Sequence, residues 1–579
     1  MPYDPSDPRS VSKIRSAINA SRAAMKPWLE LRQQARKAYV GRHYGQTSEG
    51  SDKDTINPME TLISTLTREV VAKNPQVTAS TSFPHLVPTA AALESKLNKL
   101  IGEIDLRSNL RMLFKEAMMG LGVMRVGVSV GESRGWRHQF NQPYADVVSL
   151  EDFCWDMRAH SPEQCDYMAV RYRLPLDEVK RSPLYDPSVS KDLSPTSLHG
   201  GRTEDVERDK ELELATDSNY GEYRQYVELW DCWLPWQNLM VTLPDEGSEK
   251  ALRVVTFDGP EEGPLQILSL NEVPGSLMPL PPAARALDLH EYVVRIFRKV
   301  FRDAEQRKDI PWYQGQAAED MRKLLNAAHQ EPIRVDHANA FGNFSTKGAS
   351  PQDIATALYA KRMFSEDNGN LDLLGGLSTQ AETLGQESIL NTNASRRVQD
   401  MQDRFSQAVE GIIQKLAWYA WTDPLREEIV MKRLGRTNRY VQSIWSPETR
   451  EGDLTQYDIK LVPFSMQYDP PQAKANLLLQ MFQFLATAGG PLLAQQGITP
   501  DLQTMIDLLA NWRNLPELKQ VLRYSSKPLQ LGGGSKAVPS LGNFGGNGAG
   551  RSQGGPASGG MDEIARLMSV GTNQFGGGT

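Results

Sequence analysis

The sequence contains little cysteine and no long apolar run. Only Cys154, Cys165 and Cys232 occur among its 579 residues, and none belongs to a CxxC pair. A disulfide framework is therefore not expected, and the composition suits a reducing compartment. The most apolar window, residues 477–494, holds two glutamines and two glycines and is too polar to span a bilayer. The first ten residues show no basic segment followed by an apolar stretch, so no signal peptide and no membrane association are predicted.

Recognisable catalytic motifs are also scarce. The chain has no GxxxxGK[ST] phosphate loop and no HExxH zinc motif, and its eight histidines are scattered singly. The glycines around Gly122 lack the third member of a dinucleotide fingerprint, because Arg125 stands in its place. The acidic run at 204–209 is typical of a solvated face rather than of a two-metal site. We therefore expect no enzyme and no cofactor, metal or catalytic residues, although a hydrolase with a dispersed active site remains an alternative.

The charge balance limits the contacts that the chain can make with DNA. Lys and Arg number 64 against 71 Asp and Glu, which gives a net charge of −7. Tight binding of nucleic acid needs clustered positive charge, so a generally basic DNA-binding protein is not indicated. Any contact with DNA is expected to be local, weak or sliding.

The hydrophobic pattern predicts an α+β chain that is predominantly helical. Helical spacing marks 27–40, a helix starting at Asn57-Pro58, 89–104 and 106–119. Strand-like segments follow at 123–130, 145–150, 167–172, 226–234, 238–243 and 253–257, and the Pro-rich residues 259–283 are expected to be a connector.

A helix predicted over 284–309 has two contrasting sides. Val293, Phe297, Val300 and Ala304 recur at helical spacing and form an apolar seam. The basic residues of this helix lie two positions, or about 200°, from residues of the seam, on nearly the opposite side; they are Arg295, Arg298, Lys299 and Arg302. This basic stripe is either a solvated face or a surface turned toward another subunit or toward phosphate.

Residues 310–350 are predicted to form a compact unit with a helix near 316–329, a strand at 332–335 and a Gly/Asn/Ser-rich loop. A second helix is expected over about 351–366. The polar segment 371–386, rich in glycine and free of basic residues, is interpreted either as an ordinary surface loop or as one that touches a polyanion without gripping it.

The strongest periodic signal lies in a helix predicted from about 387 to 421. Apolar residues keep 3–4 spacing over six turns and predict a buried scaffold seam; they are Val398, Met401, Phe405, Ala408, Ile412, Leu416 and Tyr419. Strands are expected at 428–432, 440–444 and 457–463, helices from 471 to about 522, and disorder in the Gly- and Ser-rich end.

This order of parts resembles the portal, or head–tail connector, proteins of tailed bacteriophages, nearest to those of short-tailed phages. The resemblance covers about residues 25–525 and rests on order and texture more than on a sharp motif. Supporting stretches are NPMETLISTLTREVVAKNP, SLEDFCWDMRAHSPEQCDYMAVRYRLPLDEVKRS, YVELWDCWLPWQNLMV and LGGLSTQAETLGQESI. In the last of these, Thr379, Ala381 and either Glu382 or Glu387 loosely match a Thr-Ala-x-Glu-like element found in the family.

The resemblance implies a portal fold built from wing, stem, clip and crown. The implied parts are a wing at 1–283, a first stem helix at 284–309, a clip at 310–350, a second stem helix at 351–368, a tunnel loop at 369–386, a second wing part at 387–470, a crown at 471–525 and a Gly-rich disordered tail at 526–579. The implied channel-lining residues are Ser378, Thr379, Gln380 and Glu382.

The resemblance also implies a structural role in the virion. Twelve copies would form a ring at one capsid vertex, through which double-stranded DNA passes non-specifically during genome packaging and ejection. The implied partners are further copies of the chain, the major capsid protein, a terminase motor and a tail adaptor protein; the host cytoplasm is the implied location during assembly. A ring of twelve would carry a net charge of 12 × −7 = −84, which lets DNA slide. Another phage structural protein, such as a head–tail adaptor or tail hub, is the main alternative.

Overall fold

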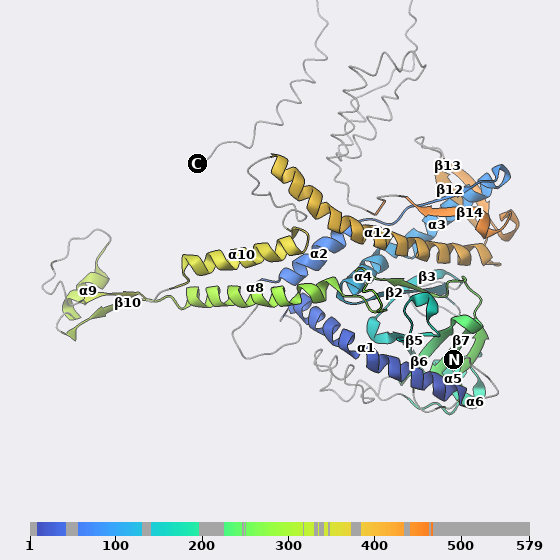
Figure 1. Ribbon diagram of the computed structural model, residues 1–579, viewed down its shortest axis with the longest axis horizontal. Helices are drawn as coiled ribbons and strands as arrows, with labels where there is room; N and C mark the ends of the chain where they lie inside the picture. Colours follow the sequence, from blue (N-terminus) through green and yellow to red (C-terminus); the bar gives the residue numbers. More distant parts are fainter. Residues whose placement is uncertain are drawn as a thin grey trace, which may run out of the picture. The chain divides into compact units, whose positions relative to one another are not determined.

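The computed structural model describes residues 9–41, 56–129, 141–195, 225–245, 248, 250–315, 318–328, 334, 341–345, 348–371, 384–433, 440–462 and 465–466. The chain divides into two compact units, Met1–Met505 and Ile506–Thr579, and all described residues belong to the first. They form both helices and strands (Figure 1).

Four helices open the described chain: α1 (Ser10–Val40), α2 (Pro58–Val70), α3 (Val87–Glu103) and α4 (Leu106–Met119). The start of α2 follows from its sequence, because the Asn57 side chain accepts a hydrogen bond from the Glu60 backbone N–H at 3.0 Å and Pro58 occupies the first helical position. The helix predicted at 106–119 is confirmed with the same bounds. Helix α1 begins well before the predicted start at Pro27, and that proline lies inside it.

Two antiparallel sheets follow. The three-stranded sheet has the order β3-β2-β9 and contains β2 (Gly122–Val128), β3 (Pro143–Val148) and β9 (Leu265–Leu268). The five-stranded sheet runs β4-β5-β6-β7-β8 and contains β4 (Phe153–Trp155), β5 (Met168–Pro175), β6 (Tyr226–Leu234), β7 (Leu239–Pro244) and β8 (Arg253–Thr256). Short helices α5 (Leu176–Arg181) and α6 (Pro187–Ser190) come after β5. The predicted connector 259–283 thus contains a strand, β9, whose partner β2 lies far earlier in the chain.

Helix α12 (Leu384–Thr422) provides the scaffold of the larger hydrophobic core. All seven residues of the predicted seam, from Val398 to Tyr419, are buried, which confirms the periodic signal. The Phe405 ring meets Phe114 of α4 edge to face, with 5.7 Å between ring centroids. The helix also contacts α2, α3 and the strands β2 and β9, so it joins the N-terminal helices to the three-stranded sheet.

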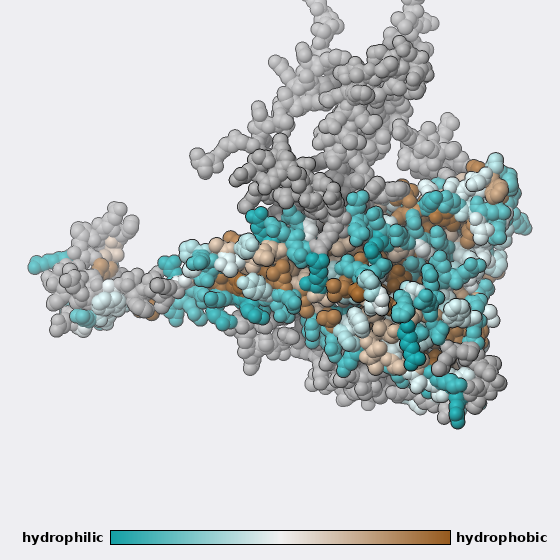
Figure 2. Space-filling view, viewed as in Figure 1, coloured by the Kyte–Doolittle hydropathy of each residue, from teal (hydrophilic) through white to brown (hydrophobic). Residues whose placement is uncertain are grey.

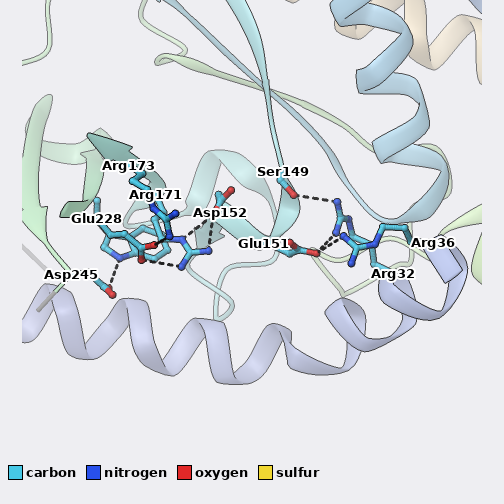
Figure 3. A network of polar contacts seen from close by, with 10 residues as sticks. Arg32, Arg36, Ser149, Glu151, Asp152, Arg171, Arg173, Glu228 and Asp245 are labelled. Atoms are coloured by element: carbon cyan, nitrogen blue, oxygen red, sulfur yellow. Dashed lines mark hydrogen bonds and ion pairs between the residues drawn. The ribbon is translucent and has the colours of Figure 1, made fainter. Parts of the chain in front are cut away.

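Ion pairs hold α1 against α4 and against the turn before β4, and a second group of ion pairs lies around Arg171 of β5 (Figure 3). Arg32 of α1 binds Glu116 of α4, with 2.9 Å between Nη2 and Oε2, and also reaches Glu151. Arg171 of β5 forms a second centre with Asp152 and Glu228. Because Arg32 is almost fully buried, each of its carboxylate partners compensates a charge that water does not reach.

The remaining described strands pair as two-stranded ribbons. They are β1 (Val77–Thr81) with β14 (Tyr457–Leu461), β10 (Asp309–Tyr313) with β11 (Phe341–Ser345), and β12 (Glu428–Arg433) with β13 (Tyr440–Trp445). Helix α9 (Ala318–Asn326) lies between β10 and β11 in the chain.

Three predicted bounds in this half of the chain are corrected. The helix predicted over 284–309 is α8 (Pro282–Glu305); it ends before Ile310, whose backbone is driven toward an extended form by Pro311. The Gly/Asn/Ser-rich loop predicted within residues 310–350 contains strand β11. Leu384–Gln386, predicted to end the tunnel loop, belong to α12, because Gly385 costs a helix only about 1 kcal/mol and does not forbid it.

Candidate functional site

Helices α8 and α10 (Pro351–Asp367) lie side by side and are joined in the chain by the β10–β11 ribbon and α9 (Figure 1). Val293 and Val300 of α8 are buried, as are Ala357, Ala360 and Phe364 of α10. The first half of α8 buries a wider face, because it also contacts α1, α2 and α4; the residues buried there include Ala283, Ala286, Leu287, His290 and Val294. After Val294, Val300 is the only buried residue among the described residues of α8, so the end of this helix and most of α10 bury only a narrow stripe.

The ends of this helix pair are fixed by polar contacts. The Ser350 hydroxyl accepts a hydrogen bond from the Asp353 N–H at 3.1 Å and caps the start of α10. At the opposite end of α10, Asp367 pairs with Arg285 of α8 at 3.1 Å between Oδ1 and Nη2. A Cβ added to Gly348 would lie 3.3 Å from the Arg307 Cβ, so the chain leaving α8 runs beside the chain entering α10. The two helices are therefore antiparallel.

The predicted apolar seam of α8 is only partly buried. Val293 and Val300 are buried and Phe297 is half-buried, but Ala304 is exposed. The seam thus packs along most of α8 and loses its cover in the last turn of the helix.

The basic stripe lies on the side of α8 that faces away from α10. Arg295, Lys299 and Arg302 are exposed and Arg298 is half-buried. The four side chains spread over an arc of about 100° on this outer side of α8, as the helical spacing indicated, with Arg295 and Arg302 at its centre. Their exposure agrees equally with a solvated face and with a surface that meets phosphate groups.

The β10–β11 ribbon exposes apolar side chains that the sequence analysis missed. Ile310, Trp312 and Tyr313 are all exposed, and Trp312 pairs with Gly342 across the ribbon. A Cβ on Gly342 would lie 3.0 Å from the Trp312 Nε1 atom, so the indole covers this glycine. The available signal was the alternation around Ile310 and Trp312, but Pro311 and Gly342 of β11 favoured a loop.

The four predicted channel-lining residues, Ser378, Thr379, Gln380 and Glu382, lie outside the described residues. So do the predicted crown, 471–525, the Gly-rich tail, 526–579, and the acidic run 204–209. The described chain places the first group between Leu371, just after α10, and Leu384 at the start of α12.

The three cysteine thiols are buried. Burial raises the pKa of the Cys165 thiol to about 12 and that of Cys232 well above its usual range, and a protonated thiol is a poor nucleophile. No cluster of three or more His, Cys, Asp or Glu side chains suited to a metal ion occurs among the described residues. No helix in this part of the chain is long and apolar enough to cross a membrane.

The pattern Gly-x-Ser-x-Gly, which marks a nucleophile turn in α/β-hydrolases, occurs at 131–135 and at 550–554. Both copies lie outside the described residues. The first falls between β2 and β3, which pair antiparallel, whereas the hydrolase turn joins a strand to a helix. Its flanking elements therefore do not fit that role.

Comparison with known proteins adds no assignment. The sequence matches no protein-family model, and no curated protein is significantly similar to it.

Proposed function

We propose that this chain is the subunit of a ring-forming DNA conduit, the portal protein of a tailed bacteriophage. The observation that carries the proposal is one structural unit: two antiparallel helices, α8 and α10, joined by a small αβ element and followed by the 39-residue helix α12. This is the stem–clip–stem order that the resemblance implies. A head–tail adaptor or tail hub would share the composition but gives no reason for this order.

In the proposed ring, α8 and α10 form the stem and residues 310–350 form the clip that docks a tail adaptor protein. The segment around Ser378, Thr379, Gln380 and Glu382 lines the channel. The ring stands at one capsid vertex beside the major capsid protein, and a separate terminase motor drives double-stranded DNA through it. Such a subunit contributes to the wall of a channel, and this role needs no catalytic group.

The first test is the mass of the purified chain. Native mass spectrometry should show a particle with twelve times the 64.6 kDa mass of one chain, and negative-stain images should show a central hole. Monomers or dimers at every salt concentration, or a solid particle, would contradict the proposal.

A second test concerns the segment between Leu371 and Leu384. Replacing residues 372–383 by a Gly/Ser linker of equal length preserves both flanking helices and the reach of the chain. We expect ring assembly to continue and the amount of packaged DNA to fall. If the rings no longer form, the segment is structural and does not line the channel.

A further inference from the structure

The two-helix layer formed by α8 and α10 exposes apolar side chains on both of its broad faces. In an α-helix, successive residues are separated by about 100°, so positions can be placed around the buried stripe of each helix. The angle of each residue is measured around its helix axis, starting from the buried stripe and counting in the direction of the chain. Because the two helices are antiparallel, positive angles on both helices point to the same face of the layer, and negative angles point to the other face. Figure 2 shows hydrophobic surface along this pair of helices, among hydrophilic residues.

The first of these surfaces, called face one, consists of Phe301, Ile354 and Leu358. On α10, Ile354 and Leu358 lie about 80° and about 120° from the centre of the buried stripe, and on α8 Phe301 lies about 70° away in the same sense. All three are exposed, and 57% of Leu358 is accessible. Phe301 near the end of α8 is level with Ile354 near the start of α10, so the three residues form one patch.

The second surface, called face two, consists of Tyr292, Tyr359 and Met363. These residues lie about 100° to 140° from the buried stripes in the opposite sense, on the other side of the layer. All three are exposed, and 64% of Tyr359 is accessible. Tyr292 is level with Met363, and both lie farther from the β10–β11 ribbon along the two helices than Phe301 and Ile354 do.

The layer is polar at its two edges. Arg295 and Arg302 mark the edge of α8, and Arg362 and Glu366, with the small Ala355 beside them, mark that of α10. Apolar faces between polar edges are expected of a layer that is covered on both sides. A single partner protein that binds through one groove would cover only one face of the layer. In a row of identical copies, each copy has a neighbour on either side, so one repeated contact covers both faces.

We propose that face one of each copy packs against face two of the next copy. The contact joins two different surfaces of the same chain, so it is heterologous, and a ring results when the rotation between copies closes. This inference rests on the proposed ring function and names the residues that hold the stem together.

The test uses the full-length chain with one charge placed in each face: Leu358→Glu in face one and Met363→Glu in face two. Each variant alone should lose the ring, with a ring population reduced by at least roughly tenfold, because every interface of the ring would bury an unpaired carboxylate. An equimolar mixture should form a one-to-one heterodimer with twice the 64.6 kDa mass of one chain by native mass spectrometry. Only the intact face of one variant can meet the intact face of the other, so growth stops at two chains.

Ala355→Glu is the matched control, since it adds the same charge to the same helix on the polar edge, where 355 is exposed; it should keep the ring. Far-UV circular dichroism checks that each variant is folded, and Ile354→Glu and Tyr359→Glu repeat the test at a second position in each face. Folded variants that keep the ring would overturn the inference, as would a single variant that forms homodimers through its intact face. Unfolding of both face-one variants would also overturn it, because that face would then support the subunit itself.

The two proposals fail in different ways. If the unaltered chain forms no ring, the proposed function fails and the inference with it. If the unaltered chain and both charged variants form rings, the ring stands and the assignment of its interface is wrong.

Discussion

Lys96 Nζ lies 2.8 Å from Glu428 Oε2, and only 3% of the Lys96 side chain is exposed. This contact ties α3 to β12, elements that lie far apart in the chain. Lys99 and Arg426 approach the same carboxylate, Lys99 at 2.9 Å. Burial lowers the pKa of Lys96, although Glu428 opposes the shift, so the ammonium depends on this carboxylate for compensation.

Replacing Glu428 by glutamine should destabilise the subunit by about 3 kcal/mol, because it leaves the buried Lys96 charge without its partner. The free energy of unfolding, from denaturant titration of the folded chain, measures the effect. Asp458→Asn serves as the control, since the Asp458–Lys460 pair is exposed on both sides and should change stability little. Equal stability of Glu428→Gln and the unaltered chain would show that the pair contributes nothing.

The same carboxylate predicts an acid-sensitive step. Burial alone would raise the pKa of Glu428, but hydrogen bonds from Lys96 and Lys99 and the charges of Lys96 and Arg426 outweigh it and lower the pKa to about 2. An acid with a depressed folded-state pKa stabilises the fold above its usual value of 4.5 and loses that contribution as pH falls toward 2. The free energy of unfolding should therefore decrease less steeply between pH 4.5 and pH 2 for Glu428→Gln than for the unaltered chain. Parallel curves would contradict the assignment.

A second buried charge, on Lys415, affects the stability of the fold at alkaline pH. Lys415 of α12 donates from Nζ to the Leu265 carbonyl at 2.6 Å, and Glu262 lies 3.7 Å away. Burial lowers the pKa of Lys415 to about 8, despite the opposing charge of Glu262. A base with a depressed folded-state pKa costs stability while it is protonated, so the fold should gain stability as pH rises from about 8 to about 10.5.

Lys415→Met should remove that gain, which is on the order of 2 kcal/mol. The measured quantity is the difference in unfolding free energy between variant and unaltered chain at pH 7.5 and at pH 10. Gln414→Met, at the neighbouring exposed position of α12, is the control and should leave the pH dependence unchanged. A constant difference between Lys415→Met and the unaltered chain at both pH values would refute the prediction.

The proposed clip predicts a separable binding defect. Trp312→Ala removes an exposed indole from the β10–β11 ribbon, so the ring should remain intact while affinity for the tail adaptor protein of the same virus falls at least roughly tenfold. Binding of purified adaptor to the assembled ring is the measurement. Trp236→Ala removes another exposed indole, from the turn after β6, and serves as the control. The ring with this substitution should bind the adaptor as tightly as the unaltered ring does. If the two variants bind equally well, the ribbon is not the docking surface.

The sequence predicted those elements that have a local hydrophobic pattern and missed those that depend on tertiary packing. Helix α4 and the seam of α12 followed from apolar periodicity, because their buried stripes are wide and continuous. Strand β9 is short and exists through its pairing with β2, so no local signal marked it. Sequence spacing placed the basic stripe on one side of α8 but gave no sign that Leu358 and Tyr359 stay exposed. Which apolar residues of a helix are covered depends on how many neighbours it has, and a single chain leaves the faces of α8 and α10 open.

The basic edge of α8 leads to the last prediction. Because both broad faces of the α8–α10 layer are assigned to neighbouring copies, its two edges are left to face the channel and the outside of the stem. Arg295 and Arg302 lie on the edge of α8 and are exposed, whereas the edge of α10 carries the exposed Arg362. In a ring with a net charge of −7 per copy, an edge that carries positive charge offers DNA phosphates a local, sequence-independent contact.

Arg295→Glu should leave the ring intact and reduce the DNA retained in filled particles, measured as DNA per particle after release of the packaging motor. The loss should shrink as salt is raised, because screening weakens the phosphate contact in the unaltered ring. Arg362→Glu changes the charge by the same amount on the other edge and is the matched control. A larger loss from the control would assign the channel to α10, and equal retention by both variant rings and the unaltered ring would show that the basic stripe is only a solvated face.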